Sequence, residues 1–240
     1  MRLSKMAPHR LYCFPHAGAG ASFFASWRKL SAQDLDIVGI PLPGREKRFL
    51  EPPLESMAEV VETAALWLQE HQAAHPVDHV HLFGHSVGAL LAFETARRLA
   101  GTSLPLRSLF VSGASGPAGK QGFGAADLPD DEFITRVADA VGYSHPAFGD
   151  PDLREMLLPP LRIDVTMHER YKPLSDEKLG IAVTALRGDK DLLIDTEDCE
   201  QWAEVTTADF ELVLQQGGHM YLADNPGTLI DVVRSRIAAL

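Results

Sequence analysis

One stretch decides the fold of this chain, Val80-His81-Leu82-Phe83-Gly84-His85-Ser86-Val87-Gly88-Ala89-Leu90-Leu91-Ala92-Phe93. It begins as a short apolar run typical of a buried strand and continues, after Gly88, as an Ala- and Leu-rich segment that favours a helix. Ser86 lies at the corner between the two, with glycine two residues to either side. A corner this sharp favours glycine at 84 and 88, because a side chain there would collide with the neighbouring strand or helix. The stretch therefore predicts a serine hydroxyl held at a helix N-terminus, where free N–H groups favour negative charge.

A strand, a Gly-x-Ser-x-Gly corner and a helix in this order are typical of the nucleophile elbow of α/β-hydrolases. The five-residue pattern alone also occurs by chance in ordinary glycine-rich turns. Here the apolar strand before it and the helix after it supply the context that the motif requires. We therefore predict that Ser86 is a catalytic nucleophile.

The composition bounds the class of protein. At 240 residues, 45% hydrophobic and 23% charged, the chain predicts one globular domain over residues 1–240. A net charge of −11 argues against nucleic-acid binding, which requires a basic surface. No apolar run reaches the length of a membrane span, and the basic segment 1–10 has no apolar core behind it, unlike a signal peptide. With only Cys13 and Cys199, far apart, we expect a reduced cytoplasmic protein without a disulfide.

Strand and helix patterns alternate along the chain. The expected strands are 11–14, 35–40, 79–83, 106–112, 181–186 and 210–214. The expected helices are 22–32, 56–74, from Ser86 to about 100, 196–205, and from 225 or 226 to the C-terminus. Such alternation predicts an α/β-hydrolase fold, with a mostly parallel sheet flanked by helices on both faces.

The region between the fourth and fifth expected strands carries helical patterns and no strand. Helices are expected at 130–141, 152–158 and 160–171. We predict that this insertion, about residues 125–175, forms a helical lid over the carboxyl ends of the strands, where ligands bind in open α/β folds.

A serine nucleophile needs a base, and the base needs an orienting acid. In this fold the chain order is Ser, then Asp or Glu, then His. His219 fits the base, since it follows two glycines on the loop that leaves the sixth expected strand. The loop after the fifth strand offers Asp189 and Asp191, with Asp195 a weaker third candidate. Asp191 is preferred because it lies further along the loop, whereas an Asp directly after glycine often caps a turn.

An oxyanion hole in this fold uses two backbone N–H groups. One belongs to the residue after the nucleophile, Val87, and the other to the glycine-rich loop that follows the first strand. In that loop we assign the N–H of Ala17, with Gly18 as the alternative. The pair His79 and His81 lacks further ligands in the pattern, so we predict no metal site. His85 is expected to be structural, and His16 is either structural or part of the site.

Several motifs in this order resemble the type II thioesterases of polyketide and nonribosomal-peptide assembly lines. They are Phe14-Pro15-His16-Ala17-Gly18, Pro43-Gly44-Arg45-Glu46, Gly84-His85-Ser86-Val87-Gly88, Leu161-Arg162-Ile163-Asp164 through Tyr171, Gly188-Asp189-Lys190-Asp191 and Gly217-Gly218-His219-Met220-Tyr221. The resemblance covers most of the chain. Two positions depart from the family: Val87 stands where Met is common, and Gly18-Ala19-Gly20 replaces a double glycine.

The resemblance implies a free-standing monomer that hydrolyses stalled or wrong acyl groups from the phosphopantetheine arm of acyl or peptidyl carrier proteins. It implies Ser86, Asp191 and His219 as the triad, and it implies no cofactor of the protein's own. Carrier proteins are usually acidic, and so is this chain, so docking would need a local basic or apolar patch, for which Arg45, Lys47 and Arg48 are the nearest candidate. A second interpretation of this loop is a solvated charged surface.

Two other functions share these features. One is a small-molecule carboxylesterase or lipase of the same fold, which would use the same triad. The other is a hydrolase-fold binding protein whose pocket holds a ligand without turnover. A third alternative concerns the catalytic groups: a Ser-Asp dyad of the patatin type could replace the triad, but the presence of His219 makes this alternative unnecessary.

Overall fold

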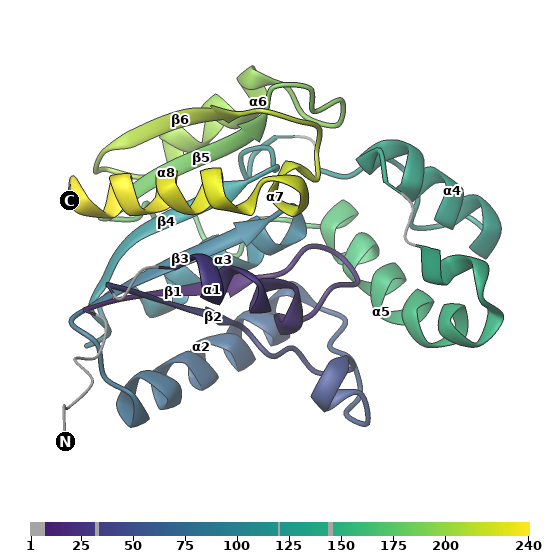
Figure 1. The fold of residues 1–240 in the computed structure, drawn as a ribbon, viewed down its shortest axis with the longest axis horizontal. Coiled ribbons are helices and arrows are strands. Elements are labelled where there is room, and N and C mark those ends of the chain that lie inside the picture. The colour runs from purple at the N-terminus through teal and green to yellow at the C-terminus, as the bar shows by residue number, and fades with distance from the viewer. Residues whose placement is uncertain (1–7, 32–33, 120, 144–145) are drawn as a thin grey trace.

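A six-stranded sheet forms the centre of the molecule (Figure 1). The computed structural model describes residues 8–31, 34–119, 121–143 and 146–240. The strand order is β2-β1-β3-β4-β5-β6, and every neighbouring pair is parallel. The strands are β1 His9–Phe14, β2 Leu35–Gly39, β3 His79–His85, β4 Leu106–Ser112, β5 Ala182–Gly188 and β6 Phe210–Gln215. All six expected strands are present, and the predicted α/β-hydrolase fold is confirmed.

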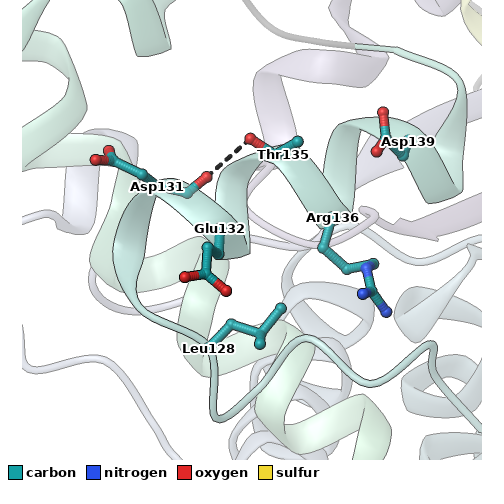
Figure 2. Close-up of a pocket in the computed structure, with 6 residues that line it drawn as sticks. All are labelled: Leu128, Asp131, Glu132, Thr135, Arg136 and Asp139. Atoms are coloured by element: carbon teal, nitrogen blue, oxygen red, sulfur yellow. Dashed lines mark hydrogen bonds between the residues drawn. The ribbon is translucent and has the colours of Figure 1, made fainter.

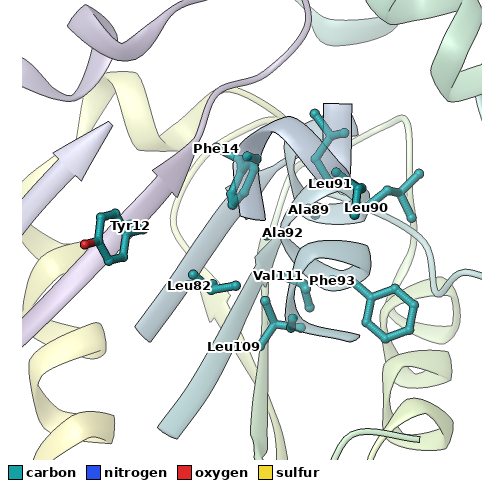
Figure 3. Packing of buried hydrophobic residues seen from close by; sticks show 14 of the residues in the cluster. Tyr12, Phe14, Leu82, Ala89, Leu90, Leu91, Ala92, Phe93, Leu109 and Val111 are labelled. Atoms are coloured by element: carbon teal, nitrogen blue, oxygen red, sulfur yellow. The ribbon is translucent and has the colours of Figure 1, made fainter. Parts of the chain in front are cut away.

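Helices cover both faces of the sheet, and alternate strand residues supply two cores. On β1, Tyr12 and Phe14 pack in one core with α2 (Met57–Ala74) and α3 (Val87–Leu99), as Figure 3 shows for the part around α3. Leu11 and Cys13 pack in the other with α1 (Trp27–Leu30) and α8 (Pro226–Ala238). The remaining short elements are α6 (Thr196–Glu200), α7 (Tyr221–Asp224) and the 3-10 helices Ala21–Ala25, Glu46–Arg48, Pro146–Gly149 and Gln201–Val205. Burial on both faces explains why the strands read as nearly continuous apolar runs.

Two predicted helices differ from the structure in their geometry. The helix expected at 22–32 is a 3-10 helix followed by the short α1, and its expected end at Ala32 lies outside the described residues. The helix expected at 196–205 likewise changes from α to 3-10 after Glu200. In the first, the Trp27 ring packs edge-on against Phe83 of β3, with ring centroids 5.3 Å apart. This packing into the core, rather than helical periodicity, sets the local backbone.

The insertion after β4 forms two helices, α4 (Asp130–Val141) and α5 (Pro151–Glu169), which stand beside the sheet rather than on its faces (Figure 1). The separate helices expected at 152–158 and 160–171 are wrong, because α5 continues through Pro159 and Pro160. Prolines inside a helix each remove one N–H and strain the preceding turn. The helix is held by its first turn, where Asp150 accepts hydrogen bonds from two backbone N–H groups, and by its buried apolar side chains.

Polar side chains of α5 fix the segment that leads into α4. Glu169 accepts backbone hydrogen bonds from Ala125 at 2.7 Å and from Ala126 at 3.0 Å. About two turns earlier, Arg162 donates to the carbonyl oxygens of Ala126 and Leu128. Among the described residues, no helix is long and apolar enough to cross a membrane.

Candidate active site

The Gly-x-Ser-x-Gly corner lies between the end of β3 and the start of α3, as the sequence predicts. Ser86 has φ +57° and ψ −126°, a backbone conformation that non-glycine residues rarely adopt. Its N–H donates to the carbonyl oxygen of Ser112, at the end of β4, at 2.8 Å. Strain of this kind persists only where the surroundings enforce it, and it gathers at functional sites.

The two glycines of the corner are required by close backbone contacts. A Cβ on Gly84 would lie 1.9 Å from the carbonyl oxygen of Gly88, and one on Gly88 would lie 2.4 Å from that of Pro15. Neither contact can be relieved by a flexible side chain, because both partners are backbone atoms. The predicted steric reason for these glycines is therefore confirmed.

Gly88→Ala is accordingly expected to destabilise the protein by about 3 kcal/mol, the upper range for overpacking a filled site. The added methyl group would push α3 away from the end of β1 and displace Ser86. Urea unfolding followed by circular dichroism measures the change. Gly227→Ala on α8 is the matched control, since a Cβ there meets nothing within 4 Å. A Gly88→Ala protein as stable as the control would contradict the close contact.

His219 and Asp191 form a buried pair. The Nδ1 atom of His219 lies 2.8 Å from Oδ2 of Asp191, and both side chains are almost fully buried. Burial alone raises the pKa of the Asp191 carboxyl, but the hydrogen bond and charge interaction with His219 and the N–H groups of Leu193 and Ile194 outweigh it, and the pKa is lowered. An ionised carboxylate only accepts hydrogen bonds, so Nδ1 carries the proton and Nε2 of the neutral ring carries the lone pair. That Nε2 is buried and has no hydrogen-bond partner among the described residues.

The other two acid candidates have local roles. Asp189 is exposed, and its Oδ1 accepts the N–H of Gly217 at 2.8 Å, which braces the loop that carries His219. Asp195 is the N-cap of α6 and accepts the N–H of Asp198 at 2.8 Å. Of the three, only Asp191 contacts His219.

His85 lies directly behind the candidate base. Its ring centroid is 4.8 Å from that of His219, and its Nδ1 is 2.9 Å from the Ser112 hydroxyl, which in turn lies 2.7 Å from the Tyr221 hydroxyl. Burial, followed by the nearby His219 and His16 rings, lowers the pKa of His85 well below its usual value. His85 therefore stays neutral at physiological pH and does not compete with His219 for a proton. These contacts agree with the structural role expected for it.

A further histidine from the lid, His168 on α5, is also placed close enough to interact with His219. It is buried, and its Nε2 lies 3.2 Å from the Gln121 side-chain oxygen. Burial, with a smaller effect of His219, lowers the pKa of His168 to about 4. His168 is not among the residues that the sequence predicts for the site. It lies on the buried face of α5 that also carries Leu161 and Val165. Its position on this helix face is therefore the one sequence signal that predicts its burial.

The predicted oxyanion-hole residues occupy the expected positions in the chain. Val87 is the first residue of α3, where the first N–H groups of a helix have no intrahelical partner. Ala17 lies in the loop after β1. The alternative, Gly18, donates its N–H to the carboxylate of Asp164 at 2.8 Å and is therefore engaged. This contact favours Ala17 over Gly18.

The three residues of the candidate basic patch, Arg45, Lys47 and Arg48, differ in exposure, since Arg45 is buried, Lys47 is exposed and Arg48 is half-buried. Arg45 is buried and paired with Asp164 at 2.7 Å. Arg48 is paired with Glu51 and also donates to the carbonyl oxygen of Pro41 at 2.8 Å. Arg45 does not contribute to a surface patch because its guanidinium pairs with a carboxylate 119 positions along the chain, a partner that a sequence pattern cannot show.

No group of three or more His, Cys, Asp or Glu side chains that could hold a metal ion occurs within the described residues, around His79 and His81 or elsewhere. His81 is instead hydrogen-bonded, with Nδ1 2.7 Å from the Ser108 hydroxyl and Nε2 3.1 Å from Nδ1 of His9. A cavity of about 350 Å³ lies along α4 (Figure 2), and none of Ser86, Asp191 and His219 lines it. Its lining residues are Leu128, Asp131, Glu132, Thr135, Arg136 and Asp139.

This chain is similar to known proteins over nearly its whole length. A thioesterase domain model matches residues 9–237. The gramicidin S biosynthesis protein GrsT of Aneurinibacillus migulanus is 33% identical over 234 residues, which cover 95% of this chain and 89% of that protein. A probable cadicidin biosynthesis thioesterase of Streptomyces griseus is 34% identical over 95% of this chain, which spans 61% of that relative's length.

A solved structure, the type II thioesterase BorB from the borrelidin biosynthetic cluster, is also similar. It superposes with a TM-score of 0.85 at 32% identity and covers 98% of this chain and 96% of its own. The likeness to type II thioesterases seen in the sequence motifs is thus confirmed over nearly the whole length. The chain belongs to the thioesterase family, whose members are hydrolases that act on thioesters.

Proposed function

We propose that this protein is an editing thioesterase, a monomer that removes stalled or wrong acyl groups from the phosphopantetheine arm of carrier proteins in polyketide or nonribosomal-peptide assembly. The observation that carries the proposal is the buried His219–Asp191 pair at 2.8 Å. His219 lies beside the elbow that carries Ser86, since the ring of His85, the residue before Ser86, is 4.8 Å from the His219 ring, and Nε2 of His219 has no hydrogen-bond partner among the described residues. The relatives named for gramicidin S, cadicidin and borrelidin biosynthesis support the substrate class.

The first half of the reaction forms an acyl-enzyme. Nε2 of His219 accepts the proton of the Ser86 hydroxyl as Oγ attacks the thioester carbonyl carbon. The N–H groups of Ala17 and Val87 stabilise the oxyanion of the tetrahedral intermediate, and Asp191 steadies the charge on the imidazolium. The carbon–sulfur bond then breaks, and the thiolate takes the proton from His219. Because thiols have pKa values near 8.5, this departure needs less acid assistance than that of an amine.

The second half releases the acid. A water molecule gives a proton to His219 Nε2 and attacks the acyl group on Ser86. Collapse of the second tetrahedral intermediate returns the proton to Ser86 Oγ and frees the carboxylic acid. The chain supplies every group in this cycle, and the phosphopantetheine arrives with the partner, so we propose no cofactor of its own.

The lid has two roles in this proposal. It covers the acyl group near His168 of α5, and its outer helix, α4, carries the exposed carboxylates Asp131, Glu132 and Asp139, of which Asp131 is paired with Arg154. An acidic carrier protein would be repelled by that surface, so docking away from α4 is expected. We also propose a cytoplasmic location, which the two free buried thiols, Cys13 and Cys199, support.

The proposal is tested by placing one acyl group on three supports: a phosphopantetheinylated carrier protein, free pantetheine and a simple alcohol. The expected result is the highest kcat/KM for the carrier thioester, with free pantetheine between it and the oxyester. Equal or faster hydrolysis of the oxyester would identify a general carboxylesterase. Binding of all three without turnover would identify a ligand-binding protein of this fold.

A further inference from the structure

A buried carboxylate connects the lid to the loop after β1. Asp164 lies on α5, near the middle of the helix, and is 3% exposed. Its Oδ2 accepts the backbone N–H of Gly18 at 2.8 Å. The two residues are 146 positions apart in the chain. Leu161, one turn earlier on α5, also reaches this loop, since a Cβ on Gly18 would lie 3.1 Å from its side chain.

The guanidinium of Arg45 completes this link from a third segment, which follows β2. Nη1 lies 2.7 Å from Oδ2 of Asp164 and Nη2 lies 3.0 Å from Oδ1, a two-pronged pair in which both side chains are buried. Nη1 also donates to the carbonyl oxygen of Ala19 at 2.9 Å. Paired, planar contacts of this type fix orientation as well as distance.

The backbone around Arg45 adopts unusual angles that present its side chain to the loop. Gly44 has φ +77° and Glu46 has φ +51°, the latter a rare conformation for a residue with a side chain. Glu46 contacts the far end of the same loop, where its Oε1 accepts the N–H of Ser22 at 2.9 Å. The loop is therefore held on one side by α5 and on the other by the segment 44–46.

We propose that Asp164 and Arg45 are positioning residues for the oxyanion hole, an inference that rests on the proposed role of the Ala17 N–H. The bond from Gly18 fixes the peptide plane between Ala17 and Gly18, and the bond to Ala19 fixes the carbonyl of Ala19. The N–H of Ala17 lies in the preceding peptide plane, whose carbonyl, that of His16, accepts the N–H of Ala19 at 3.1 Å, so that the planes on both sides of Ala17 are held. The bond also directs the Gly18 N–H to Asp164, so that only Ala17 serves the oxyanion from this loop.

Because Asp164 belongs to the lid, the link makes the oxyanion hole depend on the position of α5. A displacement of α5 by about 1 Å lengthens the contact between Gly18 and Asp164 beyond hydrogen-bonding distance. A misplacement of this size in a catalytic group costs about 10²-fold in rate. The enzyme is thus competent for acylation only with α5 seated against the loop.

The test is the double variant R45M/D164L, which replaces the buried ion pair by apolar side chains of similar size. Removing both charges together leaves no unpaired buried charge, so the melting temperature is expected to stay near that of the wild type. A second variant, Asp164→Asn, keeps the side-chain shape and is measured in the same way. Asp36→Asn, which breaks the ion pair with Arg10 at the opposite end of β1, is the matched control for loss of a salt bridge.

Four quantities are measured for each variant: kcat and KM for an acyl thioester, the inhibition constant of an alkylboronic acid, and the melting temperature. The boronic acid forms a tetrahedral adduct with a serine hydroxyl and places an oxygen in the oxyanion hole. In R45M/D164L, kcat is expected to fall about 10²-fold and the inhibition constant to rise by a similar factor, with KM within threefold. Asp36→Asn is expected to change only the melting temperature.

A folded R45M/D164L protein with kcat and boronic acid affinity within threefold of the wild type overturns the inference. If that variant does not fold, Asp164→Ala, which removes both carboxylate oxygens whereas Asp164→Asn keeps one acceptor, is judged by the same limits. Failure of the underlying triad proposal has a different signature, since Ser86→Ala would then retain activity and the boronic acid would not inhibit the wild type.

Discussion

Ser86→Ala is expected to lower kcat for an acyl thioester by about 10⁶-fold, the size of effect that follows loss of the nucleophile in a serine hydrolase. The reason is that no other hydroxyl is held at the elbow, and His219 alone cannot form the acyl-enzyme. Activity is measured by release of free thiol, and covalent labelling by a fluorophosphonate gives a second readout. The wild type is expected to be labelled at one site and the variant at none. A variant that keeps more than a hundredth of the wild-type rate would exclude Ser86 as nucleophile.

Ser86→Gly serves as the companion variant, because the backbone of Ser86 is strained. At φ +57° and ψ −126° a residue with a Cβ costs about 1–3 kcal/mol, and glycine removes most of that cost. The glycine variant is therefore expected to be as inactive as Ser86→Ala but more stable in urea unfolding. Stability equal to that of Ser86→Ala would show that the elbow stores no strain.

Local patterns were sufficient for most of the fold and for the core of the candidate site. The elbow is a contiguous stretch in which strand, glycines and helix follow one another, so sterics alone locate Ser86. Asp191 follows β5 and His219 follows β6. Because the carboxyl ends of neighbouring parallel strands lie at the same edge of a sheet, this chain order brings the two residues together. The continuous α5 was missed because Pro159 and Pro160 read as a break, and only the packing of the lid overrides that preference.

Long-range polar pairs were not predictable. Arg45 and Asp164 are 119 positions apart, and no pattern near either residue indicates the other as its partner. Arg45 therefore read as part of a solvent-exposed basic run, although it lies in the interior. One signal was present at Asp164, a charge on a helix face that otherwise carries Leu161 and Val165. A charge in such a position is buried only if it is paired, so it predicts a partner without identifying it.

Asp191→Asn is expected to lower kcat by about 10⁴-fold with little change in KM, as loss of the acid does in a Ser-His-Asp triad. Asp191 uses both oxygens, Oδ2 toward Nδ1 of His219 and Oδ1 toward the N–H of Leu193 at 2.9 Å. An asparagine that keeps its oxygen on Leu193 turns its NH₂ group toward Nδ1. The imidazole then carries its proton on Nε2, the tautomer that cannot accept the proton of Ser86. Asp189→Asn, at the exposed loop acid, is the control and is expected to lose less than tenfold.

The same variant has a stability signature whose sign follows from the pKa. Burial raises the pKa of Asp191. The hydrogen bond and charge interaction with His219 and the N–H groups of Leu193 and Ile194 lower this pKa by more than burial raises it, so the pKa in the folded protein lies below that in the unfolded chain. The carboxylate therefore stabilises the fold above about pH 4, the unfolded value, and this contribution is lost as the pH falls through the folded value. The difference in unfolding free energy between wild type and Asp191→Asn should shrink from pH 5 to pH 3. A difference that stays constant or grows would mean that the carboxylate is not held ionised by these contacts, and the tautomer argument would lose its basis.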